Sequence, residues 1–227
     1  MRLEVLSEGW TPPGLVMRED KIGELRSSLG SGVVLVVGPS GVGKTTLVKL
    51  ALDGYVYVDC GVKRTYASIV REIAGQFGLK GRLGIAVEEI LGRGGTTYVL
   101  DDYTLSKRSR RLAELVGKLA EKNAVVLVIH PSIKAELAGL AETTIEMPPY
   151  SDRELYAILE DRVIQGELPV SEEALEAISR RVGYPKGSGS ARISISVLRK
   201  ALKLSTLRGD SEVLPRHVEA AFRLLSL

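Results

Sequence analysis

The segment from Gly38 to Thr46 reads GPSGVGKTT, and its residue types and spacing point to phosphate chemistry. The order fits the phosphate-binding pattern G-x-x-x-x-G-K-[ST], known as the P-loop or Walker A motif. Glycines allow the backbone to turn with its N–H groups facing inward, which forms a nest for phosphate oxygens. The Lys44 ammonium would lie at the β- and γ-phosphates, and the Thr45 hydroxyl would bind Mg²⁺. We therefore expect ATP or ADP, with Mg²⁺, to be bound by Gly38, Pro39, Ser40, Gly41, Val42, Gly43, Lys44, Thr45 and Thr46.

Asp101 and Asp102 form a second candidate group, directly after the apolar run that ends at Leu100. An apolar strand that ends in two acids is the Walker B pattern. Asp101 would hold Mg²⁺ largely through water, because this ion keeps most of its hydration shell. Asp102 takes the place of the carboxylate that orients the attacking water. A strand that merely ends in a solvated acidic turn is the alternative, which the preceding P-loop disfavours.

The elements around the glycine-rich segment are those that a phosphate-binding loop needs. Residues 33–37 are a β-branched run of the kind expected for a buried parallel strand, and residues 46–52 read as a helix. The loop would thus connect a strand to a helix whose positive N-terminal end faces the phosphates. A glycine turn that matches the pattern by chance is the alternative, and this context disfavours it.

Strand and helix patterns alternate up to residue 149, and helical patterns alone follow. Such alternation implies a parallel sheet with right-handed crossovers. We expect an α/β fold of the P-loop NTPase class, with a five-stranded parallel sheet flanked by helices as the nucleotide-binding core over 1–149. Residues 150–227, where Ser151 and Glu154 have capping-box spacing, would form a small all-helical lid domain. The expected strands are 33–37, 55–59, 96–102, 124–129 and 143–147.

A polar residue at the tip of the strand over 124–129 is a candidate sensor of the γ-phosphate. The sequence offers His130 and Ser132 for this role and does not choose between them. A side chain that caps the next helix is an equally good interpretation.

The composition excludes several classes of protein. Hydrophobic residues make up 44% of the 227 residues, as in globular proteins, and no apolar run approaches the ~20 residues of a membrane helix. The single cysteine rules out a disulfide framework and is compatible with a reducing cytoplasm, where we expect the protein. A net charge of +3 permits contact with nucleic acid without requiring it.

With these motifs in place, the chain resembles the AAA+ ATPases, and within them the archaeal origin-recognition and replication-initiator clade. The Walker motifs alone specify only a P-loop ATPase. The motifs for the hinge between core and lid and for the sensor-2 helix of the lid are more specific for this clade. The remaining motifs that carry the resemblance are Arg18-Glu19 near the N-terminus, Pro148-Pro149-Tyr150-Ser151 at the hinge, and Gly189-Ser190-Ala191-Arg192 with 197–201 in the sensor-2 helix.

The resemblance implies further nucleotide-binding residues. Arg18 would lie beside the adenine, Tyr150 would belong to the hinge next to the nucleotide, and Arg192 would be the sensor-2 arginine that contacts the γ-phosphate. A guanidinium that reaches a phosphate from the lid makes lid closure depend on the bound nucleotide. A surface arginine near a helix start is the alternative for Arg192.

Three departures from the family pattern limit what can be carried over. The family's arginine finger completes the site of a neighbouring copy, and no arginine lies between Arg111 and Arg153, where that finger falls. Lys134 lies in this segment but cannot reproduce a planar guanidinium. Asp102 replaces the usual glutamate. The chain also ends where such initiators continue into a winged-helix domain, which is either missing from the gene or removed. We expect a catalytic set of Lys44, Asp101, Asp102 and Arg192 that hydrolyses ATP to ADP and phosphate slowly, or with a protein partner that supplies the finger.

Two functions fit these features. The first is an ATP-binding switch related to replication initiators, which would contact duplex DNA. The alternative is a signalling-type P-loop ATPase that acts as a nucleotide-gated scaffold without DNA. A small-molecule phosphotransferase fits poorly, because a C-terminal helical domain is unusual for such kinases. The candidate DNA contacts, which are more often a solvated helix face, are Lys63, Arg64, Lys107, Arg108, Arg110 and Arg111.

Overall fold

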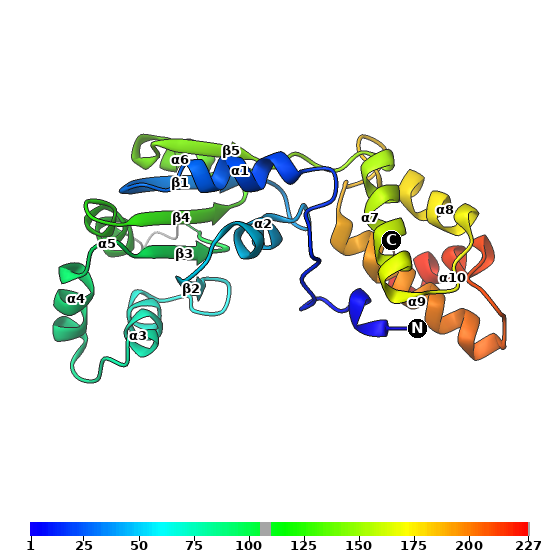
Figure 1. The fold of residues 1–227 in the computed structure, drawn as a ribbon, viewed down its shortest axis with the longest axis horizontal. Coiled ribbons are helices and arrows are strands. Elements are labelled where there is room, and N and C mark those ends of the chain that lie inside the picture. Colours follow the sequence, from blue (N-terminus) through cyan, green and yellow to red (C-terminus); the bar gives the residue numbers. More distant parts are fainter. Residues whose placement is uncertain (105–109, 227) are drawn as a thin grey trace. The chain divides into compact units, whose positions relative to one another are not determined.

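The computed structural model describes residues 1–104 and 110–226 (Figure 1). Its contacts divide the chain into two compact units, each of which is described by itself. The sheet unit comprises residues 20–38 and 47–147. The helical unit comprises residues 1–19, 39–46 and 148–227. No helix within the described residues has the length and apolarity to cross a membrane.

A five-stranded parallel sheet forms the centre of the sheet unit, in the order β2-β3-β4-β1-β5. This confirms the predicted fold class. Every residue of the two strands β1 and β4 is buried, as expected where helices cover both faces of a parallel sheet. The strands are β1 (Gly32–Val37), β2 (Tyr55–Asp59), β3 (Thr97–Asp101), β4 (Ala124–Ile129) and β5 (Thr143–Glu146).

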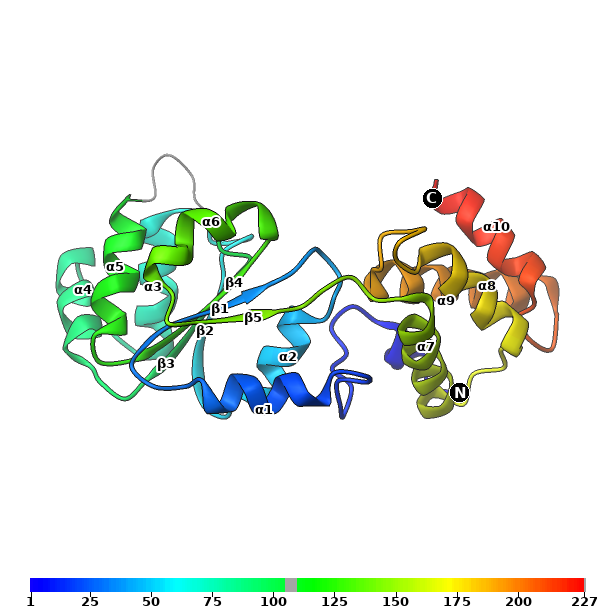
Figure 2. The same ribbon diagram turned by 90° about the horizontal axis from the view of Figure 1, so that it is seen from above.

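Helices cover this sheet on both sides, with α1 and α2 on one face and α5 and α6 on the other (Figure 2). Local signals in the sequence place their starts. Thr65, for example, accepts a hydrogen bond from the backbone N–H of Ser68 and so caps α3. The helices are α1 (Glu19–Ser27), α2 (Lys44–Ala51), α3 (Tyr66–Gln76), α4 (Leu83–Gly92), α5 (Arg110–Ala120), η2 (Pro131–Ile133), α6 (Lys134–Leu137) and η3 (Ala138–Leu140).

Four helices and a short N-terminal turn make up most of the helical unit. Ser151 and Glu154 form the predicted capping box at the start of α7, and Ser171 and Ser190 cap α8 and α9. These elements are η1 (Leu3–Leu6), α7 (Asp152–Gly166), α8 (Glu172–Val182), α9 (Ala191–Arg208) and α10 (Pro215–Leu225).

The N-terminal residues pack with the helical unit, because their apolar side chains are buried there. Val5, Leu6 and Leu15 are each at most 4% exposed. The Arg162 guanidinium of α7 lies 4.0 Å from the ring centroid of Trp10 and donates a hydrogen bond to the carbonyl of Val5. Residues 1–19, and likewise 39–46, therefore group with 148–227, which differs from the sequence-based division at residue 149.

Candidate functional site

The glycine-rich loop has the backbone form that a phosphate nest requires. Gly41 and Gly43 have φ values of 82° and 87°, in the left-handed region that glycine adopts without strain. Helix α2 begins directly afterwards at Lys44, whose Nζ donates a hydrogen bond to the carbonyl of Pro39 at 2.7 Å. The loop thus combines a sharply turned backbone, a cation folded back over it and a helix N-terminus, which together favour an anion.

The loop is bonded to the start of α9. The Ala191 N–H donates to the carbonyl of Gly41 at 2.9 Å, and Arg192 Nη1 donates to Ser40 Oγ at 3.1 Å. The approach is close, because a Cβ atom added to Gly41 would lie 2.0 Å from Ser190 Oγ. The structure therefore places Arg192, the predicted sensor-2 arginine, next to the predicted phosphate-binding loop.

In the sheet unit, the Asp101 carboxylate at the end of β3 is held by hydrogen bonds at both of its oxygens. Asp101 is buried, with 7% of its surface exposed. The Asp102 N–H donates to Oδ1 at 2.8 Å, and the Tyr57 hydroxyl donates to Oδ2 at 2.9 Å. Sequence reasoning missed Tyr57. The strand over 55–59 was visible in the sequence, but the pairing of β2 with β3 was not.

The environment of this carboxylate keeps its neighbours protonated. Burial and the charge of Asp101 raise the pKa of the Tyr57 hydroxyl. Burial and the charges of Asp101, Asp59 and Asp102 raise the pKa of the Cys60 thiol to about 12. Tyr57 is therefore a hydrogen-bond donor at neutral pH, and Cys60 is a neutral thiol.

Asp102 is exposed and has a φ of 52°, a left-handed value that is uncommon for a residue other than glycine. Its side chain lies over the turn that follows β2. A Cβ added to Gly61 would lie 2.7 Å from Asp102 Oδ2 and 3.1 Å from Asp59 Oδ1. Glycine at position 61 therefore leaves the space that this carboxylate occupies.

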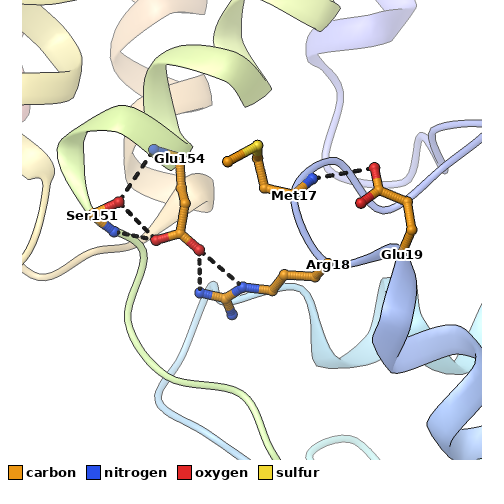
Figure 3. Close-up of polar contacts among 5 residues, drawn as sticks. All are labelled: Met17, Arg18, Glu19, Ser151 and Glu154. Atoms are coloured by element: carbon orange, nitrogen blue, oxygen red, sulfur yellow. Dashed lines mark hydrogen bonds and ion pairs between the residues drawn. The ribbon is translucent and has the colours of Figure 1, made fainter.

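Arg18 is buried at 4% exposure and joins the N-terminal segment to α7 (Figure 3). Its guanidinium carbon lies 3.6 Å from the ring centroid of Tyr150. Its Nε and Nη2 donate to Glu154 Oε1 at 3.4 and 3.2 Å, while the N–H and hydroxyl of Ser151 each donate to Oε2 at 2.8 Å. The predicted adenine-side residues Arg18 and Tyr150 thus contact each other, within the helical unit.

The charge of Glu154 makes this arrangement sensitive to pH. Burial alone would raise its pKa, but the hydrogen bonds from Ser151 and the charge of Arg18 outweigh burial and lower the pKa. A carboxyl group whose pKa is lowered by folding stabilises the folded state at pH values above its unfolded pKa of ~4.3. This stabilisation is lost as the pH falls below that value. We expect the melting temperature of the E154Q variant to fall less between pH 6 and pH 3 than that of the wild type. Parallel melting curves would contradict this assignment.

His130 contacts Ser132, the other candidate sensor. Its Nδ1 accepts a hydrogen bond from the Ser132 N–H at 3.2 Å and lies 2.9 Å from Ser132 Oγ. The imidazole therefore caps the turn η2, as the capping alternative anticipated. A role in sensing the γ-phosphate stays a prediction for both residues.

Of the six candidate DNA contacts, Lys107 and Arg108 lie outside the described residues. Lys63 pairs with Glu72 at 3.1 Å, and Arg110 pairs with Glu114 at 3.2 Å on the surface of α5. Arg64 Nε donates to the carbonyl of Gly61 at 2.7 Å. Arg111 is exposed. These contacts are those of a solvated surface, and such exposed pairs are weak enough to exchange for phosphate contacts.

The side chains predicted to bind Mg²⁺ have the right chemistry for that ion. Thr45 offers a hydroxyl at the start of α2, and Asp101 offers a carboxylate at the end of β3. Both are oxygen donors, which Mg²⁺ prefers, and one or two protein ligands are usual because phosphates and water complete its shell. Each of the two side chains, taken by itself, therefore offers a donor that fits a magnesium ion bound with a nucleotide.

Comparison with known proteins gives a consistent result. A family profile described as "AAA domain" matches residues 28–130. Among curated proteins, an ORC1-type DNA replication protein 2 of Sulfurisphaera tokodaii is 31% identical over 96% of this chain. The chain spans 65% of the length of that protein and of its Saccharolobus solfataricus counterpart.

Two solved structures share the fold. The Aeropyrum pernix ORC1 protein in complex with DNA matches with a TM-score of 0.85 at 20% identity, over 99% of this chain and 69% of that one. The Aeropyrum pernix ORC2 protein, solved as ADPNP–ADP complexes, matches with a TM-score of 0.81 at 22% identity, over 97% of this chain and 70% of that one.

Proposed function

Because this chain belongs to the AAA+ proteins of the archaeal origin-recognition clade, we propose that it is an ATP-binding switch related to DNA replication initiators. The bound nucleotide would set the state of the helical unit, and thereby a surface for DNA or protein partners. The observation that supports this most directly is the bonding of the phosphate loop to α9 through Gly41 and Ala191 and through Ser40 and Arg192. A ligand in the loop would be in contact with the helical unit.

Nucleotide binding would use the groups gathered at the loop. The backbone N–H groups between Gly38 and Lys44 would donate to phosphate oxygens, and the Lys44 ammonium would neutralise charge on the β- and γ-phosphates. The Thr45 hydroxyl and the Asp101 carboxylate would hold Mg²⁺. That ion, when bound, supplies further neutralisation of phosphate charge.

Hydrolysis would require a water oriented by the Asp102 carboxylate, in line with the bond to the leaving ADP. The products are ADP and inorganic phosphate. No arginine lies between Arg111 and Arg153 to serve as a finger for a neighbouring copy. Since such a guanidinium contributes roughly 10³-fold or more, we expect the chain alone to be slow, and a protein partner with a suitable arginine to accelerate it.

Arg192 would couple the nucleotide to the helical unit by exchanging partners. Its Nη1 donates to the neutral Ser40 hydroxyl, whereas a terminal phosphate offers a charged acceptor, which makes a stronger hydrogen bond. ATP would therefore draw Arg192 from Ser40 to the γ-phosphate, and loss of that phosphate would return it. The bonding between the loop and the start of α9 would therefore differ between the two nucleotide states.

Duplex DNA is the partner that the family relationship favours. One structural relative was solved in complex with DNA, and the curated relatives are replication proteins. In this chain, exposed cations such as Arg64 and Arg111 would contact the phosphate backbone. We place this function in the cytoplasm.

Equilibrium binding of a fluorescent ATP analogue and of labelled duplex DNA would test the proposal. We expect micromolar or tighter nucleotide binding, and DNA binding that weakens steeply with salt because counterions are released. Absence of nucleotide binding would contradict the switch. Nucleotide binding without retention of DNA at ~50 mM salt would favour the scaffold alternative instead.

A further inference from the structure

We propose that Tyr57 is a positioning residue for the magnesium ligand Asp101, and that it tunes how strongly Mg²⁺ binds with the nucleotide. This inference rests on the proposed function, because it concerns the same site. It assigns a role to a strand residue that lies outside the Walker motifs. Both residues belong to the sheet unit.

The register of the sheet places the two side chains together. Strand β2 pairs in parallel with β3, with Tyr57 opposite Val99 and Asp59 opposite Asp101. The Tyr57 side chain reaches along the sheet toward the carboxyl end of β3. Its hydroxyl there donates to Asp101 Oδ2 at 2.9 Å.

The hydroxyl completes the fixation of the carboxylate. The Asp102 N–H holds Oδ1 at 2.8 Å, and the Tyr57 hydroxyl holds Oδ2. The terminal torsion of an aspartate is soft, so a bond to one oxygen alone leaves the plane of the carboxylate free to turn. Donors at both oxygens define that plane and satisfy a charge that is almost fully buried.

Tyr57 is itself held in place, as a positioning residue must be. Strand β2 lies at one edge of the sheet, where its outer backbone groups have no further strand as partner among the residues that the structure describes. The Gln76 side chain of α3 takes that place, because its Oε1 accepts from the Tyr57 N–H at 3.0 Å and its Nε2 donates to the Tyr57 carbonyl at 2.7 Å. The Tyr57 ring also packs edge-on against Tyr55, with centroids 6.3 Å apart.

Loss of this donor should weaken metal binding more than nucleotide binding. Groups that orient a metal ligand typically contribute about 10–100-fold in metal affinity or activity. The quantity to measure is the magnesium factor, which is the affinity for a non-hydrolysable ATP analogue in excess Mg²⁺ divided by the affinity in EDTA. We expect the Y57F variant to reduce this factor by about tenfold, with unchanged affinity in EDTA.

Isothermal titration of the analogue into the purified chain, with and without Mg²⁺, provides the test. The Y55F variant is a matched control, since it removes a hydroxyl from the same face of β2 that is not bonded to Asp101. It should retain the wild-type factor, while D101A should lose it. A further variant with p-aminophenylalanine at position 57 carries a hydrogen-bond donor at the same place and should restore the magnesium factor.

The outcomes separate the inference from the function on which it rests. If the wild type fails to bind the analogue in both buffers, the proposed ATP switch is refuted. If the wild type binds with a magnesium factor and Y57F retains that factor, the positioning role is refuted while the switch stands. Failure of p-aminophenylalanine to restore a lost factor would also overturn the role, because loss of packing would then explain the defect.

Discussion

The K44A variant is expected to bind ATP roughly 30-fold or more weakly than the wild type. Truncating one member of a hydrogen-bonded charge pair in a binding site costs about 2 kcal/mol or more, and 1.4 kcal/mol corresponds to a factor of ten. Lys44 is the first residue of α2, and its Nζ folds back to the carbonyl of Pro39 over the loop. Alanine at this position would leave bound phosphates without the ammonium group of Lys44.

The matched control for this variant lies on the same helix. Lys49 is exposed in the last turn of α2, so K49A removes the same charge without touching the loop. Titration of a fluorescent ATP analogue into the wild type, K44A and K49A compares the three. Equal affinities of K44A and wild type would refute the phosphate site, and an equal loss in both variants would indicate an effect of net charge alone.

Local features of this fold could be read from the sequence, because their signals lie within a few residues. Ser151 caps α7 as its spacing with Glu154 predicted, and the apolar runs over 33–37 and 124–129 became buried strands. The geometry of the glycine-rich loop also follows from its own residues. Gly41 and Gly43 take left-handed φ values that few other residues accept.

Contacts between distant segments could not be predicted in this way. The bond between Tyr57 and Asp101 depends on strand order, and that between Arg18 and Glu154 spans 136 residues. Neither pair has a local pattern that marks it, since its two residues lie 44 positions apart in the first pair and 136 in the second. The grouping of residues 39–46 with residues 148–227 likewise depends on the contact of Ser190 with the loop.

This contact of Ser190 with the loop also bears on the proposed slow hydrolysis. No arginine lies between Arg111 and Arg153, and under the proposed function identical copies would then supply one another with no guanidinium from this segment to speed hydrolysis. The nucleotide state would then persist, and a slow switch needs a contact that reports the bound phosphates while they last. The bonds from Ala191 and Arg192 to the loop are suited to that task.

The G41A variant is expected to disrupt this contact and to weaken ATP binding by at least about tenfold. Two physical effects combine. Gly41 has a φ of +82°, where an L side chain costs about 1–2 kcal/mol, and its added Cβ would lie 2.0 Å from Ser190 Oγ and 3.1 Å from Arg192 Cβ. The second effect is relieved only if the Ser190 hydroxyl rotates away from its bond with the Ile193 N–H or the loop and the start of α9 separate.

Two further variants distinguish the clash from the strain. Gly54 has a φ of +68° with nothing within 4 Å of an added Cβ, so G54A carries a comparable strain without the clash. We expect G54A to lower the melting temperature and to keep its affinity for ATP. Combining G41A with S190A removes the atom that the new methyl group would meet first, so the double variant should regain part of the lost affinity. If G41A binds ATP as well as G54A does, or if S190A restores nothing, then the loop and α9 do not act as one unit in nucleotide binding, and Arg192 would need another route to the phosphates.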